Sequence, residues 1–468
     1  MNGVYPILEY GAQSGADFDA TASIQSAIDA CHAAGGGRVL VTPGLFRILR
    51  LTLRAHVELH LMAGARLVGI SDPRPAERLA LLEAKDADFI SVTGLGIIDG
   101  DSQSYVATRI PYHLGGVENR PKIMLFEHCK NVTITGITIE NAPTWTIHPV
   151  GCENVLISSI RILNDLRMAN SDGIDPDHCQ NVRIADCTIR CADDCIVLKN
   201  TLPYRQYGPC RDILITGCQL TSTSAGFKIG SETWDRFENI VMSDCIITDS
   251  NRGIGIQLRD TGSVETALFQ NITIHTRYFY PRFWGKADPI WITAIPRDPD
   301  QPTGSIRGVR FSNIVIRSEG SIFVQGTQPG DISGVTFDGL DITLYKQSKW
   351  EGGLYDRRPA TMTREQKERA PRPGNGREGN SNIPLLDISE ADAHRSANIF
   401  RDKANALRLE NASDVCVRNT TARFEGDQPY YGDALRAIDV NGLRVENFRA
   451  RTAHADDRPL RLENTTMA

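Results

Sequence analysis

The tetrapeptide Asn131-Val132-Thr133-Ile134 returns along the chain in closely similar form. Neighbouring copies start 23 to 31 residues apart. A period of this size is typical of solenoids, in which each repeat forms one coil stacked on the previous one. The repeats therefore predict an all-β, single-domain solenoid of parallel strands. The further copies are Asn154-Val155-Leu156-Ile157, Asn181-Val182-Arg183-Ile184, Asp212-Ile213-Leu214-Ile215 and Asn239-Ile240-Val241-Met242.

A dense acidic cluster lies among these repeats, in Asn170-Ser171-Asp172-Gly173-Ile174-Asp175-Pro176-Asp177 and in Cys191-Ala192-Asp193-Asp194-Cys195. Asp193 follows Asp172 by 21 residues, about one coil. Since stacked strands lie roughly 4.8 Å apart, we expect these two side chains side by side. Two carboxylates that close cannot both ionise easily, so they can divide into an acid and a base, as hydrolysis of a glycosidic bond requires. Asp175 and Asp177 are interpreted as turn residues.

The segment Asn170-Ser171-Asp172-Gly173 resembles the Asn-Thr-Asp-Gly motif of the family 28 glycoside hydrolases, the polygalacturonase family. Asp193-Asp194 is similar to the paired aspartates of that family. The resemblance implies a right-handed parallel β-helix and an inverting glycosidase acting on a pectin-related or other plant-type oligosaccharide. It assigns Asp193 as the general acid, with Asp172 and Asp194 activating water. Inversion implies an acid-to-base separation of roughly 6.5 to 9.5 Å.

The chain departs from the family at its cationic positions. The Gly-His-Gly motif aligns with Ser224-Ala225-Gly226, and the Arg-Ile-Lys motif, which grips a uronate carboxylate, aligns with Gly255-Ile256-Gln257. Without these cations we expect a substrate other than unsubstituted galacturonan, such as a neutral or deoxy sugar. Two sets of residues are candidates for substrate binding. Trp145 and His148 are expected one coil before Asp172. Within or just after the aligned positions lie Lys228, Glu232, Trp234, Gln257 and Arg259. Lys199 is interpreted as a surface residue.

The remaining segments suggest how the solenoid is closed. Residues 1–37 contain a helical pattern from Ala20 to Ala34, predicted to cap the N-terminal end. Residues 38–348 are predicted to form the β-helix with its catalytic cleft, and residues 402–468 its last coils. Residues 349–401 are rich in Gly, Pro and Arg and form an inserted loop region, a possible lid. Long loops beginning near residues 101, 201 and 349 are placed to block one end of the cleft, which favours exo action.

Composition limits the partners. A net charge of −6 and a pI near 6.0 provide no basic surface for nucleic acid. No export signal follows Met1, and no apolar run approaches the roughly 18 residues of a membrane span. We therefore expect a cytoplasmic protein with an oligosaccharide substrate, no membrane partner, no cofactor and no metal. The oligomeric state is left open.

Eleven cysteines raise the question of disulfides or zinc. Cys187, Cys218 and Cys245 share one offset within their repeats, where earlier repeats carry Ile137 and Ile160. Cysteine therefore replaces isoleucine in an interior column, as a small buried apolar residue does. We expect these thiols to pack in the core, reduced.

Two other functions compete with hydrolysis. A calcium-dependent polysaccharide lyase can also be a β-helix in which clustered aspartates bind metal. A non-catalytic β-helix that only binds carbohydrate would explain the lost histidine and cations.

Overall fold

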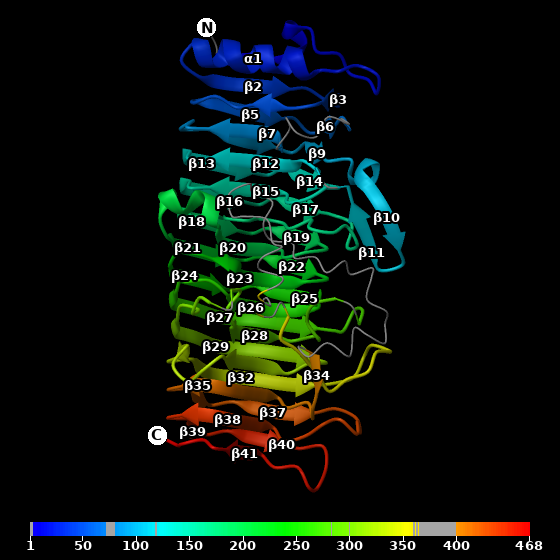
Figure 1. Cartoon of the computed structure of the whole chain (residues 1–468). Helices are drawn as coiled ribbons and strands as arrows, with labels where there is room; N and C mark the ends of the chain where they lie inside the picture. Colours follow the sequence, from blue (N-terminus) through cyan, green and yellow to red (C-terminus); the bar gives the residue numbers. More distant parts are fainter. Residues whose placement is uncertain are drawn as a thin grey trace. The chain divides into compact units, whose positions relative to one another are not determined.

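The computed structural model describes residues 3–71, 80–117, 119–281, 283–298, 300–358, 361, 364 and 399–468. Strands dominate these residues (Figure 1). The chain divides into two compact units. The first contains Met1–Val197 and Arg211–Gln219, and the second contains Leu198–Cys210 and Leu220–Ala468. The domain boundaries expected from the sequence remain predictions.

The first unit is built from coils whose strands form three series of parallel pairs. Each strand pairs with the equivalent strand of the neighbouring coil, as predicted for a parallel β-helix. One series runs β1 (Val4–Pro6), β2 (Gly37–Val41), β5 (Val57–Leu61), β8 (Ser91–Gly94), β13 (Lys130–Thr135), β16 (Glu153–Ser158), β18 (Gln180–Ala185) and β21 (Cys210–Thr216). The second runs β3 (Gly44–Ile48), β6 (Ala65–Gly69), β9 (Ile97–Asp99), β14 (Thr138–Glu140), β17 (Arg161–Leu163) and β19 (Thr188–Cys191).

The third series is the one that leads to the acidic cluster. It contains β4 (Leu51–Thr52), β7 (Ala80–Lys85), β12 (Lys122–Glu127) and β15 (Ile147–Val150). Beyond β15 the same position is continued by single bridges, from Ile147 to Ile174 and from Ile174 to Ile196.

The Asn-Val-x-Ile repeat has a structural explanation in each of its positions. The valine and isoleucine point into the core, where Val155 and Ile157 stack on their equivalents in the coils before and after. The asparagine occupies the left-handed backbone region, with φ of 58° at Asn131, 59° at Asn154 and 54° at Asn181. Asparagine tolerates that region better than most residues, because its short polar side chain bonds locally.

The predicted N-terminal helix is confirmed as α1 (Thr21–Ala33). Its face with Ile24, Ala27, Ile28 and Cys31 is completely buried and packs on β1 and β2. The helix therefore covers apolar edges of the first coils that would otherwise meet water.

The second unit repeats the coil architecture with longer strands. Its core holds a column of stacked phenylalanines, in which the ring centroids of Phe269 and Phe311 are 5.0 Å apart and those of Phe311 and Phe337 are 5.3 Å apart. These rings come from β27 (Val264–Thr276), β29 (Ile306–Ser318) and β32 (Thr336–Leu344). Another series runs β23 (Ala225–Thr233), β26 (Arg252–Leu258), β28 (Ile290–Ala294), β30 (Ile322–Gly326), β35 (Leu407–Ser413) and β38 (Leu435–Asn441).

The base of the predicted insertion is ordered and regular. Strand β33 (Leu354–Asp356) pairs antiparallel with β34 (Ile399–Arg401). We call this pair the strap. Tyr355 of the strap stacks on Phe400, and both rings pack against Phe323 of β30. Most of the insertion, including the possible lid tip, lies outside the described residues.

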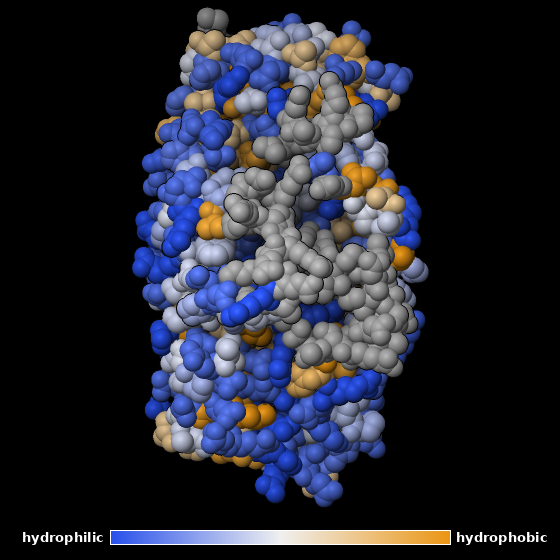
Figure 2. All heavy atoms as spheres, in the orientation of Figure 1, coloured by the Kyte–Doolittle hydropathy of each residue, from blue (hydrophilic) through white to orange (hydrophobic). Residues whose placement is uncertain are grey.

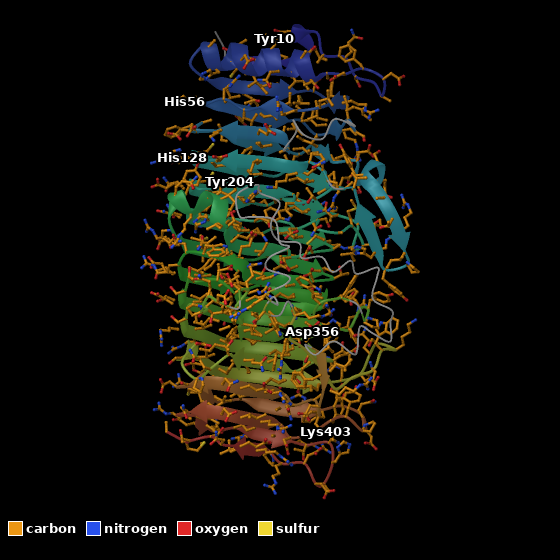
Figure 3. The ribbon with its side chains drawn as sticks, in the orientation of Figure 1. Tyr10, His56, His128, Tyr204, Asp356 and Lys403 are labelled. Carbon is orange, nitrogen blue, oxygen red and sulfur yellow. The ribbon has the colours of Figure 1, made fainter. Side chains whose placement is uncertain are left out.

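Charge also fixes the strap to the second unit. Asp356, labelled in Figure 3, is fully buried and accepts hydrogen bonds from the Gly285 amide at 2.9 Å and from the Arg358 guanidinium at 2.7 Å. Lys286 lies 3.5 Å from the same carboxylate. Although burial opposes ionisation, Arg358 and Lys286 keep the pKa of Asp356 well below its usual range.

Cys187, Cys218 and Cys245 are buried in the core, as predicted, and of the other cysteines only Cys416 is partly exposed. All eleven are free and lie within the described residues. Cys187 continues the column of Ile137 and Ile160, and its thiol pKa is raised by a hydrogen bond with Cys218 and by burial. A second cysteine column, formed by Cys129, Cys152 and Cys179, was not predicted.

The face shown in Figure 2 is mostly hydrophilic where it is coloured, with hydrophobic spots scattered over it. Among the described residues, no helix combines the length and the apolar character that crossing a membrane requires.

We expect Asn154→Ala to lower the free energy of unfolding by about 1 kcal/mol, because alanine is strained at positive φ. The side chain of Asn154 also bonds to Asn131 and Asn181. Asn154→Gly should cost less, because glycine adopts this region freely. Denaturant unfolding measures both, with exposed Arg183→Ala in β18 as the control. An alanine variant as stable as the glycine variant would contradict this explanation.

Candidate active site

The acidic cluster is positioned by turns and not by regular strands. Between β17 and β18 the chain contains only isolated bridges, and Asn170 has a φ of 57°. Gly173 is required by close approach, because a Cβ there would overlap the carbonyl oxygen of Cys195 in the next coil. The motif's glycine therefore permits tight stacking beside Asp172.

The register between coils brings Asp172 opposite Asp194. The Gly173 amide donates to the Asp194 carbonyl at 2.9 Å, and Ile174 bridges to Ile196. The predicted direct stacking of Asp172 on Asp193 is therefore wrong by one residue. The bend between β19 and β20 (Ile196–Asn200) supplies the extra residue and turns Asp193 away from the position opposite Asp172.

The three carboxylates nevertheless converge. One oxygen from each of Asp172, Asp193 and Asp194 lies within 4.8 Å of the others. Asp172 is 3% exposed and Asp194 1% exposed, whereas Asp193 is half-buried. This spacing is shorter than the roughly 6.5 to 9.5 Å expected for an inverting pair. The arrangement places one accessible carboxyl beside two enclosed ones, which suits an acid working with a water-binding pair.

The same three oxygens form a donor set that a hard divalent cation accepts. No protein nitrogen or sulfur belongs to this set, so its chemistry matches calcium or magnesium better than zinc. The expected absence of a metal remains a prediction.

Trp145 lies one coil before the acids, as predicted. The amide of the next residue, Thr146, donates to the Asp172 carbonyl at 2.9 Å. The Trp145 ring is half-buried, and the Lys122 ammonium lies 4.6 Å from its centroid. A partly open aromatic face next to the carboxylates is suited to stacking on a sugar ring.

His148 is enclosed instead of facing the solvent. It is 1% exposed, accepts a hydrogen bond from Lys122 at Nδ1 (2.7 Å), and donates from Nε2 to Asp177 at 3.3 Å. The structure therefore places it in a chain of hydrogen bonds that runs from the half-buried Lys122 to the fully buried Asp177. Asp175 and Asp177 are both 0% exposed, neither lies in a turn, and Asp177 bridges to Val150, so their interpretation as turn residues is wrong.

The other candidate binding residues belong to the second unit. Lys228, Glu232 and Trp234 are half-buried, and Lys228 pairs in register with Gly255. The missing side chain at Gly255 leaves room beside the Lys228 stem. Lys199 is 6% exposed, so the prediction of a surface lysine is wrong.

Gln257 is the most unusual of these residues. It is 1% exposed, and neither its amide oxygen nor its amide nitrogen has a hydrogen-bond partner within the described part of the chain. An unpaired buried amide costs about 1 to 3 kcal/mol, which a polar ligand group can recover.

Arg259 is also buried, at 4% exposure, so it is not a solvated surface arginine. Burial and the nearby Arg297 lower its pKa to about 9, while Asp260 acts in the opposite direction. It remains a cation at neutral pH.

Two residues near the acids were missed from the sequence. Lys122 contacts Trp145 and His148, and Arg120 interacts electrostatically with Asp172 and Asp193. Both lie about 50 residues or more before the motif, at the end of a loop, and no local pattern marks them.

Comparison with known families shows which family the chain belongs to. The sequence profile of glycosyl hydrolases family 28 matches residues 52–349. The chain belongs to this family. The prediction of a glycosidase family is therefore confirmed.

Individual relatives are distant. A probable polygalacturonase of Vitis vinifera is 27% identical over 281 residues, covering 53% of this chain and 55% of that protein. An endo-polygalacturonase of Pectobacterium carotovorum subsp. carotovorum is 23% identical over 237 residues, covering 50% of this chain and 55% of that protein. The chain thus spans about half the length of these relatives.

Solved structures confirm the fold. The exopolygalacturonase of Thermotoga maritima superposes with a TM-score of 0.60 at 20% identity, covering 96% of this chain and 91% of that one. The family 28 exopolygalacturonase of Yersinia enterocolitica gives 0.65 at 14% identity, covering 95% and 78%. The fold is a right-handed parallel β-helix, as predicted.

The expected cytoplasmic location is wrong. The plant and microbial polygalacturonases that match this chain are typically secreted or extracellular enzymes.

Proposed function

We propose that this member of family 28 is an inverting glycoside hydrolase that removes sugar units from the end of a pectin-related oligosaccharide. The observation that carries the proposal is the convergence of Asp172, Asp193 and Asp194 within 4.8 Å. Asp193, the accessible member, is the general acid that protonates the leaving oxygen. Asp172 and Asp194, enclosed and opposite one another, hold and activate the attacking water.

Exo action is supported by the strap. In the second unit Gly255 pairs with Trp291, and Trp291 pairs with Phe323. The strap covers Trp291 and Phe323. The Trp291 indole donates to the Asp356 carbonyl at 3.1 Å, and Tyr355 packs on Phe323. The strap therefore covers this column from the second strand beyond Lys228, which would limit how far a polymer extends along it.

Substrate choice follows from charge. At the family's two cationic positions this chain has Gly255 and Gln257, and the unpaired Gln257 amide suits a hydroxyl better than a carboxylate. A galacturonate carboxylate near three aspartates would be repelled unless other cations compensate. The substrate is therefore a neutral or deoxy sugar at the position of cleavage, or a uronate whose carboxylate is masked.

A calcium-dependent lyase is the second candidate, favoured by the all-carboxylate donor set. It predicts loss of activity with a chelator and a product with the ultraviolet absorbance of an unsaturated sugar. Hydrolysis predicts neither result.

We expect Asp193→Asn to lower kcat by about 10²-fold or more, because general acid catalysis contributes about 10² to 10⁴. Asp172→Asn and Asp194→Asn should be similarly impaired, with substrate binding retained. Asp186→Asn, on an outer turn of the first unit, is the matched control. Rates near wild type for Asp193→Asn on a substrate with a poor leaving group would exclude Asp193 as the acid. A protein that binds oligosaccharide but shows no turnover even as wild type would be a non-catalytic β-helix.

We expect kcat/KM to be at least about tenfold higher for neutral than for galacturonide oligosaccharides of equal length, a difference of about 1.4 kcal/mol. Gln257→Lys should shift this ratio toward the galacturonide, because it returns a cation to a position where the family carries one. Gln219→Lys makes the same charge change at an exposed position and should leave the ratio unchanged. A clear wild-type preference for unsubstituted galacturonides would show that Lys228 or Arg259 supplies the missing charge.

A further inference from the structure

Arg120 lies at the junction between a hairpin and the acidic motif. The hairpin consists of β10 (Val106–Ile110) and β11 (His113–Gly116), and Leu114 of β11 bridges to Met168, just before the motif. Tyr105, Leu114 and Met168 form a small buried cluster there. The long loop expected to begin near residue 101 thus contains an antiparallel hairpin with a register shift between Val106 and Thr108, packed against the segment that leads to Asp172.

The guanidinium of Arg120 ties three segments of the first unit together. It donates to the carbonyl oxygens of Pro143 at 2.7 Å and Ala169 at 2.5 Å, and to Asn170 Oδ1 at 2.9 Å. A further bond runs to the Val117 carbonyl at 3.1 Å. Four of its five N–H groups are therefore used to hold backbone and the motif's first side chain.

The space around this guanidinium is shaped for it. A Cβ at Gly116 would overlap the Cδ, Nε and Cζ atoms of Arg120. Since Gly116 has no positive φ in the left-handed region, its lack of a side chain is explained by this close approach and not by its backbone conformation.

Arg120 also brings charge to the cluster. Its bonding partners are neutral oxygens, whereas the carboxylates of Asp172 and Asp193 are the groups that favour its charged form. Burial lowers the pKa of Arg120 to about 10, so the cation persists at neutral pH. On the adjacent hairpin, burial and Arg120 lower the pKa of His113, so this imidazole adds no second cation at neutral pH.

We propose that Arg120 is a positioning residue of the hydrolytic reaction, which clamps the Asn170–Asp172 segment and supplies the positive charge that stabilises the ionised carboxylates. This inference rests on the proposed function. It assigns this charge to a residue outside the recognised motifs.

The test compares Arg120→Gln, Arg120→Lys and Gly116→Ala with wild type, and uses Arg109→Gln on the adjacent hairpin as the matched control. Arg109 is exposed and bonds to Gln103. Arg120→Gln should lower kcat about 10²-fold with a smaller change in KM, because misplacement of a catalytic group by about 1 Å has that effect. It should also shift the acidic limb of the pH profile of kcat to higher pH by about one unit, because carboxylates without a neighbouring cation ionise at higher pH. Arg120→Lys should keep most of the wild-type pH profile, and Gly116→Ala should lower kcat without moving the limb.

A second measurement does not need activity. The difference in Tm between wild type and Arg120→Gln should be larger at pH 7 than near pH 3.5. Carboxylates stabilised by Arg120 contribute stability when ionised and lose it as the pH falls through their folded-state pKa. A pH-independent difference, or an acidic limb unmoved in Arg120→Gln, would overturn the proposal even if wild type hydrolyses oligosaccharides. If wild type shows no hydrolysis, the proposed function fails, and the pH dependence of Tm still decides whether Arg120 stabilises the carboxylates.

Discussion

The hydrogen bonds between successive coils are the constraint on which the rest of this structure depends. In the first unit they keep Val132, Val155 and Val182 in one core column. The same bonds align the outer positions, so the Gly173 amide meets the Asp194 carbonyl and the two buried aspartates lie opposite each other. A register shift of one residue would exchange core and outer faces and separate the acids.

The coils provide columns, but the chemistry requires departures from them. Asp193 reaches the cluster only because the chain bends after Cys191, and Asp172 follows turns held by hydrogen bonds from other segments. Asn164, for example, donates to the Ser171 carbonyl and to Thr146. The regular strands of the neighbouring coils therefore act as a rigid frame, and the irregular segments between them determine where the carboxylates point.

The sequence predicted what depends on local pattern. The Asn-Val-x-Ile repeat predicted the coils, because its asparagine, valine and isoleucine each have one structural role. The spacing of apolar residues predicted the helix at residues 20–34. Asp172, Asp193 and Asp194 were recognised from motif spacing. The partner of Asp172 was misassigned, since one residue in the bend before Asp194 cannot be counted from spacing alone. Other features depend on contacts between segments far apart in the chain, which no local pattern records. They are the burial of Asp175, Asp177 and Lys199, and the interaction of Arg120 with Asp172 and Asp193.

The central claim is that Asp193 and the Asp172-Asp194 pair act in a single displacement by water. Their 4.8 Å convergence is closer to the spacing of about 5 to 5.5 Å in retaining enzymes than to the usual inverting range, so separation alone does not establish the outcome. Proton NMR of the first product formed, recorded before mutarotation, measures it directly on a cleaved oligosaccharide. The account predicts that the inverted anomer appears first. Initial release of the retained anomer would show a covalent intermediate and contradict the roles assigned to the three aspartates.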